Sequence, residues 1–410
     1  MTLAAPAASL VLPPATMRLA FVLLVPFLPL TAHAIVGCKL DGQPIDMNNG
    51  AATAGKTGMV HCFNGDDLPF RDIELRNGRQ MGVMRYYQKG ILQKETTTNE
   101  RGNQDGIART FAATPGPKNQ LLREEIMKNG ETVGVVRTWY PDGTLQRLGW
   151  HPGNGTETAV AGFTTQGKLS DLRCTTQPVF APDFDDATAC GFRSGPNTVE
   201  LFAPKGWLAA RVTWDHGERR HIESLWENGK PQQVVELGTA SGGENDFDED
   251  GVKRKTLAWI VQPSGIPSKP GTRVTTLQQD YHESGPLVRE QKWTSNGHGA
   301  DLTEDQTWYL NGQLQSRDEY SVQDGQHRRR SMTYFDNGKT STITTWVVRS
   351  DDEDLAIGVH QAFDKEGRLR AESTYDAHGR VTRERTLDAS GKVLHDDQLF
   401  EDGSRKAFAK

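Results

Sequence analysis

Phe363-Asp364-Lys365-Glu366-Gly367-Arg368-Leu369-Arg370-Ala371-Glu372-Ser373-Thr374-Tyr375 contains one turn and one strand of a pattern that repeats toward the C-terminus. From Leu369 onward the apolar side chains share one parity and most charges the other, which is the period of a strand with one solvated face. Before that strand, Asp364 can bond its own backbone and Gly367 allows the positive φ of a tight turn. The glycine recurs every 12 residues, as Gly367, Gly379, Gly391 and Gly403.

A 12-residue unit of this kind is one strand plus one turn, and two units make a hairpin. Because a single hairpin cannot bury its face alone, the units must stack into a long sheet. Hydrophobic content of 35% and a mean hydropathy of −0.62 are too polar for a large spherical core, which agrees with a thin sheet. We therefore expect an all-β fold, an elongated antiparallel sheet of stacked β-hairpin repeats.

A second repeat nearer the N-terminus reads glycine, aliphatic, any residue, arginine, any residue, aromatic. Its copies are Gly82-Val83-Met84-Arg85-Tyr86-Tyr87, Gly106-Ile107-Ala108-Arg109-Thr110-Phe111 and Gly134-Val135-Val136-Arg137-Thr138-Trp139. Asn77-Gly78 and Asn129-Gly130 precede the first and third copies. Asn-Gly between two strands is the strongest short signal for a hairpin, so these residues predict turns.

The segment from Asn77 to Glu95 resembles the YwqK-type repeat, a variant of the MORN repeat, and the resemblance covers most of residues 71–170 and 280–405. Trp308-Tyr309-Leu310-Asn311-Gly312 looks like the same unit. The resemblance implies stacked, MORN-like β-hairpins and, by the family's usual label, an antitoxin-like role. Tyr375-Asp376-Ala377-His378-Gly379 also resembles, at motif level, the tyrosine-aspartate repeat of Rhs toxin shells.

The N-terminal residues predict export. Met17-Arg18 precedes an apolar run from Leu19 to Leu30, and Thr31-Ala32-His33-Ala34 supplies an Ala-x-Ala cleavage site. We expect a signal peptide over residues 1–34, with Met17 as the true start, and a periplasmic or extracellular location in a bacterium. The run is too short for a transmembrane span. Ile35-Val36-Gly37-Cys38 loosely matches a lipobox but does not abut the apolar run, so a lipid anchor is disfavoured.

Four cysteines form two local groups, Cys38 with Cys62 and Cys174 with Cys190. An even count in an exported chain indicates disulfides. Local pairing is the simplest of the three connectivities, which the sequence alone does not decide. Either local bridge would be a structural staple, because the chain has no Cys-x-x-Cys motif for redox chemistry.

The composition along the chain suggests four segments after the signal peptide. These are a small disulfide-stapled leader over 35–70, a first β-repeat array over 71–237 with an insertion at Cys174–Cys190, an irregular acidic and proline-rich excursion over 238–271, and a second β-repeat array over 272–410.

One acidic stretch matches the first half of a calcium loop. Asp246, Asp248 and Asp250 stand at the first, third and fifth positions, followed by Gly251. The twelfth position is Leu257 instead of glutamate, and basic residues crowd the site. A solvated acidic loop is the favoured interpretation, with calcium as the alternative; we expect no other cofactor.

Residues 50–57 match the P-loop pattern from Gly50 to Thr57. A P-loop needs a buried strand before it and a helix after it, so that backbone N–H groups point at phosphates. Neither neighbour is indicated here, because Cys62 follows within five residues of Thr57. A glycine-rich loop inside a disulfide is the preferred interpretation.

The net charge of −6 gives no case for nucleic acid. Since no catalytic motif is present, we expect a non-enzymatic protein that recognises a protein partner, either a toxin or an envelope protein. The alternative is an envelope polymer-binding protein or hydrolase with its site within 171–271. Facing carboxylates with raised pKa values in that region would favour the alternative.

Overall fold

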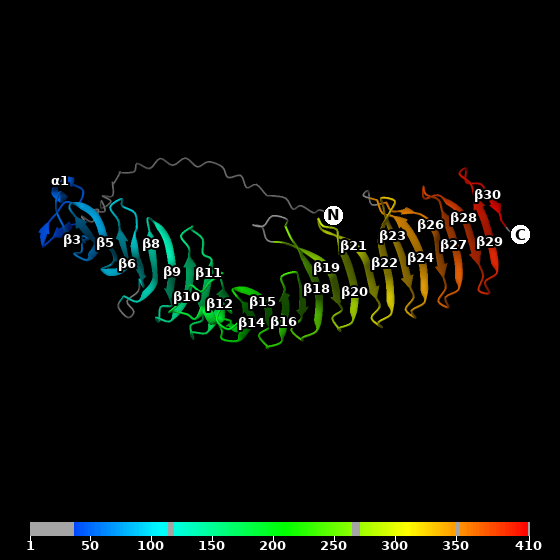
Figure 1. Ribbon diagram of the computed structural model, residues 1–410, viewed down its shortest axis with the longest axis horizontal. Coiled ribbons are helices and arrows are strands. Elements are labelled where there is room, and N and C mark those ends of the chain that lie inside the picture. The colour runs from blue at the N-terminus through cyan, green and yellow to red at the C-terminus, as the bar shows by residue number, and fades with distance from the viewer. Residues whose placement is uncertain (1–36, 114–118, 265–270, 350–352, 409–410) are drawn as a thin grey trace, which may run out of the picture.

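The computed structural model describes residues 37–113, 119–264, 271–349 and 353–408, and it is almost entirely β-strand. The strands follow one another in space in chain order, except for β1 and β2 at one end. They form a long curving ribbon from β3 near one end to β30 at the other (Figure 1). The all-β fold of stacked antiparallel hairpins is therefore confirmed. The predicted signal peptide and Met17 lie outside the described residues.

Two sheets make up the ribbon within the described residues. The first has twelve strands: β1 (Gly37–Leu40), β2 (Gln43–Pro44), β3 (Gly58–Phe63), β4 (Pro69–Arg76), β5 (Arg79–Gln88), β6 (Ile91–Thr98), β7 (Gly106–Phe111), β8 (Leu121–Lys128), β9 (Glu131–Trp139), β10 (Leu145–His151), β11 (Ala159–Phe163) and β12 (Leu169–Arg173). Two short helices lie outside the two sheets: α1 (Gly50–Thr53) and α2 (Asp186–Ala189). None of the described helices is long and apolar enough to cross a membrane.

The second sheet has eighteen strands. They are β13 (Asn197–Phe202), β14 (Leu208–Asp215), β15 (Glu218–Leu225), β16 (Pro231–Leu237), β17 (Ser241–Phe247), β18 (Lys253–Gln262), β19 (Thr272–Tyr281), β20 (Leu287–Ser295), β21 (Ala300–Trp308), β22 (Leu314–Gln323), β23 (Gln326–Tyr334), β24 (Thr340–Val347), β25 (Leu355–Ala356), β26 (Gly358–Phe363), β27 (Leu369–Tyr375), β28 (Val381–Leu387), β29 (Val393–Leu399) and β30 (Arg405–Ala407).

Two kinds of turn connect the strands, and both need backbone in the left-handed region. At Asn77-Gly78 both residues have positive φ, of 50° and 79°, as a two-residue type I′ hairpin requires. At Asp364 the chain makes a tight turn in which the Gly367 N–H donates to the Asp364 carbonyl at 2.8 Å, and only the glycine has positive φ, of 85°. This second form is a type I turn followed by a glycine bulge. The turns predicted at both sites are present.

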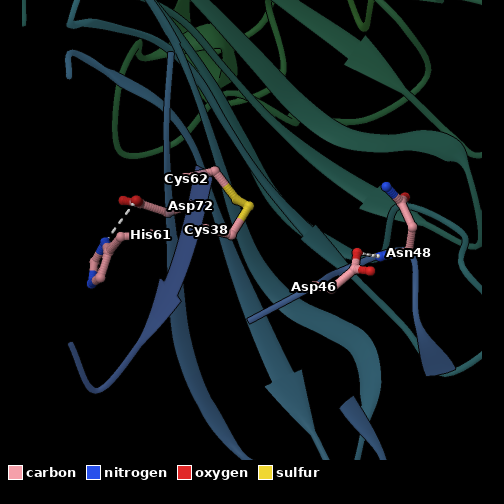
Figure 2. Close-up of a disulfide and its surroundings, with 6 residues drawn as sticks. All are labelled: Cys38, Asp46, Asn48, His61, Cys62 and Asp72. Atoms are coloured by element: carbon pink, nitrogen blue, oxygen red, sulfur yellow. Dashed lines mark hydrogen bonds and ion pairs between the residues drawn. A yellow bond between two sulfur atoms is a disulfide. The ribbon is translucent and has the colours of Figure 1, made fainter. Parts of the chain in front are cut away.

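The segment expected to be a separate leader is part of the first sheet. Strand β1 pairs with β3, and the Cys38–Cys62 disulfide joins directly opposed residues of these two strands (Figure 2). Val60 and Ile73 are buried in the core beneath it. Among the described residues, the first sheet therefore already begins at Gly37, inside the disulfide-stapled leader expected over 35–70.

The break between the two sheets falls at residues 174–196, which we call the joint segment. The Cys174–Cys190 disulfide closes it, as the insertion predicted there requires. Phe180, which is 1% exposed, packs in a core that includes Leu148 of the first sheet and Trp214 of the second. The joint segment thus fills the core between the last strands of one sheet and the first strands of the next.

The irregular excursion expected over 238–271 is wrong for most of that interval. Residues 241–247 and 253–262 form β17 and β18, and every residue of β17 pairs with one of β18 between Lys253 and Ile260. Gly242 misled the prediction because glycine in a strand usually weakens it. Here the indole of Trp259 lies against Gly242, where an added Cβ would come within 2.6 Å of the ring. The glycine serves a close approach inside a regular strand pair.

Candidate interaction surface

The three arginines of the glycine–aliphatic–arginine repeat lie on one line across the first sheet. Arg85 is on β5, Arg109 on β7 and Arg137 on β9. The intervening strands place Glu95 and Glu124 between them in register. Because directly opposed residues share a face of the sheet, the five side chains form a ladder of alternating charge. We call this face of β5–β9 the ladder face.

Ion pairs connect the rungs of the ladder. Glu95 accepts from the Arg85 Nε at 2.8 Å and from the Arg109 Nη1 at 3.2 Å. Glu124 accepts from the Arg109 Nε at 2.9 Å and lies 3.8 Å from the Arg137 Nη1. Each glutamate therefore bridges two arginines, so the ion pairs form one connected network instead of separate pairs.

Carboxylates close the ladder at both ends. At the N-terminal end, Asp72 accepts from the Tyr87 hydroxyl at 2.6 Å and lies 4.0 Å from the Arg85 Nη1. His61 contacts the other oxygen of Asp72 at 2.8 Å (Figure 2). At the far end, Asp183 of the joint segment accepts from Arg137 at 2.6 Å. The joint segment therefore borders the ladder face as well as filling the core.

Hydrogen bonds within the ladder favour the charged form of its arginines. A hydrogen bond to Glu95 raises the pKa of Arg85, and a hydrogen bond to Glu124 raises that of Arg109. Burial, followed by the bond to Asp72, raises the pKa of Tyr87 to about 12. The Arg85 and Arg109 side chains are 35% exposed, so each pair contributes roughly 0.2–1 kcal/mol. The ladder sets the side-chain positions of this face more than it sets global stability.

Apolar and aromatic side chains flank the ladder on the same face. Two residues before each arginine stands an aliphatic residue, and two residues after it an aromatic one. These are Val83, Ile107 and Val135 on one side and Tyr87, Phe111 and Trp139 on the other. Ile107 and the opposed Ile126 are 43% and 44% exposed. The face combines exposed apolar surface with oriented charge, which suits contact with another protein.

Gly106 begins β7, whereas Gly82 and Gly134 lie three residues inside β5 and β9. Gly82, Gly106 and Gly134 have φ values of 90°, 118° and 76°. At Gly82 a Cβ would collide with the Glu74 carboxylate, which accepts from the Val83 N–H at 2.7 Å. Glycine at this position therefore lets a carboxylate of the neighbouring strand bond the backbone.

The later glycines Gly367, Gly379, Gly391 and Gly403 all have positive φ at the turn positions that the 12-residue repeat predicted. In three of these turns an aspartate side chain bonds the backbone two and four residues on. The Asp376 Oδ1 accepts from the N–H groups of His378 at 2.8 Å and Arg380 at 2.9 Å. The structure assigns these residues to architecture, and they do not converge on one site.

The three predicted calcium ligands are distributed between a strand and a turn. Asp246 belongs to β17 and accepts from Gln233 at 3.0 Å. Asp248 bonds the N–H groups of Asp250 at 3.0 Å and Val252 at 2.8 Å, which lowers its pKa. The described residues contain no group of three or more His, Cys, Asp or Glu arranged to hold a metal ion. The turn accounts for the acidic pattern, and calcium binding stays a prediction.

The P-loop match does not have the local structure of a nucleotide site. Residues 50–53 form α1, within the glycine-rich pattern itself, and strand β3 begins at Gly58 directly after the match. The Asn49 side chain caps α1 by accepting from the Ala51 N–H at 3.0 Å. A short capped turn inside the Cys38–Cys62 loop is what the disulfide interpretation predicts.

Sequence reasoning found the repeat arginines but not all of their partners. Glu124 and Asp183 carry no motif of their own, and Asp183 stands 46 residues from Arg137. A search for glutamates at the centre of the strand between two repeat copies could have found Glu124. No local signal indicates Asp183, because its place depends on how the joint segment folds back.

Comparisons with known proteins add little to this description. No family model and no curated protein match the chain. Among solved structures, TarM is 11% identical, covering 28% of this chain and 21% of its own, with a TM-score of 0.19. TcdB2-TccC3-Cdc42 is 9% identical over 85% of this chain and 18% of its own, with a TM-score of 0.18. TcdB2-TccC3 without its hypervariable C-terminal region is 11% identical over 86% of this chain and 22% of its own, with a TM-score of 0.13.

This chain spans only about a fifth of the length of each of these structures' chains. Such likenesses are too slight to assign a family or an activity. The resemblance to the YwqK-type repeat stays a prediction.

Proposed function

We propose that this chain is an exported, non-enzymatic β-repeat protein that binds a protein partner through the ladder face of its first sheet. The supporting observation is the exposed pair Ile107 and Ile126 beside the ladder of Arg85, Arg109 and Arg137. Exposed isoleucines at the centre of a sheet face gain free energy when a partner removes them from water, by roughly 25 cal/mol for each Å² of apolar surface buried.

The charges of the ladder favour a protein over a small ion as the partner. Every arginine of the ladder already has a carboxylate within 3.2 Å, so the face has little unbalanced charge to attract an ion. Fixed charges beside an apolar stripe instead give a protein interface its register and specificity. Following the family resemblance, the partner is a toxin or an envelope protein.

Both disulfides support an oxidising location for the chain. Cys38–Cys62 and Cys174–Cys190 pair all four cysteines of the sequence. Disulfides persist in secreted and periplasmic proteins and are rare in the cytosol. A partner should therefore be sought in the envelope or outside the cell.

The test is capture of a partner from a periplasmic extract under gentle crosslinking, followed by identification and binding of the purified partner. The variant carries Ile107→Glu and Ile126→Glu, which places two carboxylates on the ladder face. The control carries Val322→Glu and Val359→Glu, two residues of the second sheet that are 59% and 45% exposed. We expect the ladder-face variant alone to lose the partner. Failure to capture any protein, or equal loss in both variants, would contradict the proposal.

One observation favours the alternative of a polymer hydrolase within 171–271. Glu244 and Asp246 stand two residues apart on β17, so they share a face, and the Gln233 amide donates to both at 3.1 and 3.0 Å. Burial, followed by the charge of Asp246, raises the pKa of Glu244. A carboxyl with a raised pKa beside a second carboxyl is the kind of pair in which one group can act as an acid and the other as a base.

Assay of the purified chain on envelope polysaccharides decides this alternative. Hydrolysis that Glu244→Gln abolishes, while Asp250→Asn leaves it intact, would support an enzyme. If the wild-type chain cleaves none of these polysaccharides, the hydrolase alternative is contradicted and only the binding proposal stands.

A further inference from the structure

A cleft of about 540 Å³ opens beside the joint of the two sheets. Its walls come from the end of β12, from β14 and β15, from the end of β16 and the turn after it, and from β18 and β19. Among its lining residues are four arginines and a single carboxylate, Glu218. The chain as a whole has a net charge of −6, so this cleft is a local concentration of the opposite charge.

Two of the four arginines are neutralised by nearby carboxylates. The Arg173 Nη2 donates to Glu157 at 2.8 Å. The Arg220 Nη2 donates to Glu218 at 3.0 Å, and its Nε lies 3.6 Å from Asp215. These pairs account for the only lining carboxylate. The charge of Arg273 acts on Glu244, where it opposes the rise of that pKa, but the two groups form no direct ion pair.

The other two arginines lie on tryptophan rings. The Arg219 guanidinium is 5.9 Å from the ring centroid of Trp214, and that of Arg273 is 4.9 Å from Trp259. Neither guanidinium forms an ion pair with a carboxylate of the described residues. A guanidinium stacked on a ring is oriented while its in-plane N–H groups stay free to donate.

The fold places these two stacks in one cleft through irregularities of the strands. A register shift between Thr213 and Trp214 sets Trp214 opposite Arg219. On β18, Val261 is opposed to Arg273, so Arg273 lies on the face of Trp259. Trp214 and Trp259 are 4% and 7% exposed, so they are fixed platforms for the guanidinium groups.

Trp214, which lines the cleft, also belongs to the core of the joint. Its Nε1 atom is buried and has no hydrogen-bond partner in the protein. A buried donor without a partner carries a desolvation cost that a hydrogen bond would offset.

We propose that this cleft binds an oxyanion, a phosphate or carboxylate group, through the guanidinium groups of Arg219 and Arg273. Guanidinium donates two parallel hydrogen bonds to either group, and such charged bonds are roughly twice as strong as neutral ones. Arg173 and Arg220 add positive potential at the rim, while Glu218 opposes it. The inference is independent of the ladder face, since no residue is shared between the two sites.

Calorimetric titration tests the proposal with two probes, inorganic phosphate and trigalacturonate, whose charges come from phosphate and carboxylate respectively. The variant carries Arg219→Gln and Arg273→Gln, which keeps the aliphatic stems over the tryptophans. Arg79→Gln is the control, because Arg79 is an exposed arginine of β5 outside the cleft. We expect at least one probe to bind, and the double variant to weaken it at least tenfold, or about 1.4 kcal/mol. The control should leave the affinity unchanged.

Two outcomes would overturn the proposal. One is that neither probe binds with a Kd below about 10 mM. The other is that the double variant binds as the wild type does. If the double variant does not fold, titration of the wild type at raised salt replaces it. Affinity must then fall with ionic strength, because exposed charge pairs are screened within about 10 Å at 0.1 M salt; an affinity that salt does not change is the third overturning result. The probe that binds identifies the source of the anion.

Discussion

The first sheet and the C-terminal strands β26–β30 are both built from antiparallel strands joined by tight turns, but they are stabilised differently. In the first sheet, chain segments outside the ladder contribute to buried cores: Ile45 and Met47 pack against Val60 and Ile73, and the joint segment packs against Leu148. Val60 and Leu148 are fully buried. Each of these covering regions lies within or next to a disulfide loop.

Strands β26–β30 have no such cover among the described residues. Leu387 and Asp396 are the buried side chains there, whereas Val359, Leu394 and Phe400 are 45%, 55% and 45% exposed. Hydrogen bonding between strands, the aspartate–glycine turns and cross-strand pairs hold this region. One of these is a bidentate pair in which Arg383 donates twice to Asp396 at 2.8 Å. The repeats therefore supply the paired strands, while the buried cores depend on segments outside the repeats.

Truncating one buried leucine in each region should give the largest difference between them in the free energy of unfolding. Leu148→Ala removes a fully buried side chain of the joint core and should reduce the free energy of unfolding by about 2–5 kcal/mol. Leu387 is also buried, but it belongs to neither of the two core clusters, so Leu387→Ala should cost less, about 1–2 kcal/mol. Urea unfolding followed by hydrogen exchange of each region measures both. Equal losses would mean that the two regions are not stabilised differently.

Removing the Cys174–Cys190 disulfide should give the second-largest difference in stability between the two regions. Cys174→Ser with Cys190→Ser opens a loop whose ends are 16 residues apart and should destabilise the joint by about 3 kcal/mol. Residues 272–408 contain no cysteine, so their exchange protection should stay unchanged. The measurement is hydrogen exchange by mass spectrometry on both forms. Loss of protection throughout β26–β30 would show instead that the ribbon unfolds as one unit.

Lowering the pH should have the smallest effect on folding stability, and this effect should arise at the aspartate turns. The Ser390 hydroxyl and the Lys392 N–H lower the pKa of Asp388 below its ordinary value of 3.8. A lowered folded-state pKa gives stability that is complete above pH 3.8 and is lost as pH falls through the folded value. Asp388→Asn keeps an acceptor but cannot titrate, so it should remove this share of the acid sensitivity. NMR titration of the carboxyl checks it; a pKa at or above 3.8 contradicts the turn's role.

Local patterns in the sequence predicted the fold well. Each glycine of the 12-residue repeat was expected at positive φ, and the structure has φ of 79–86° at all four. Asn77-Gly78 likewise predicted its hairpin. Such turns depend on bonds between residues at most four apart, so the sequence contains all the information that they need.

The candidate surfaces were predicted only in part. The repeat identified Arg85, Arg109 and Arg137, but their glutamates are found only once the register is known. Composition also misplaced the break between the sheets. Glycine and acidic residues around 241–251 resemble a linker, whereas Trp259 and the Asp248 turn make the same residues a regular strand pair.

The amino-acid sequence by itself determined that this chain is an antiparallel β-ribbon with tight glycine turns, because those features arise from the conformational preferences of single residues and their near neighbours. The tertiary structure alone decided where the ribbon breaks, that Asp183 ends the arginine ladder, and that Arg219 and Arg273 share a cleft. Those contacts depend on strand register and bulges accumulated over many residues, and a shift of one position would turn the side chains to the opposite face.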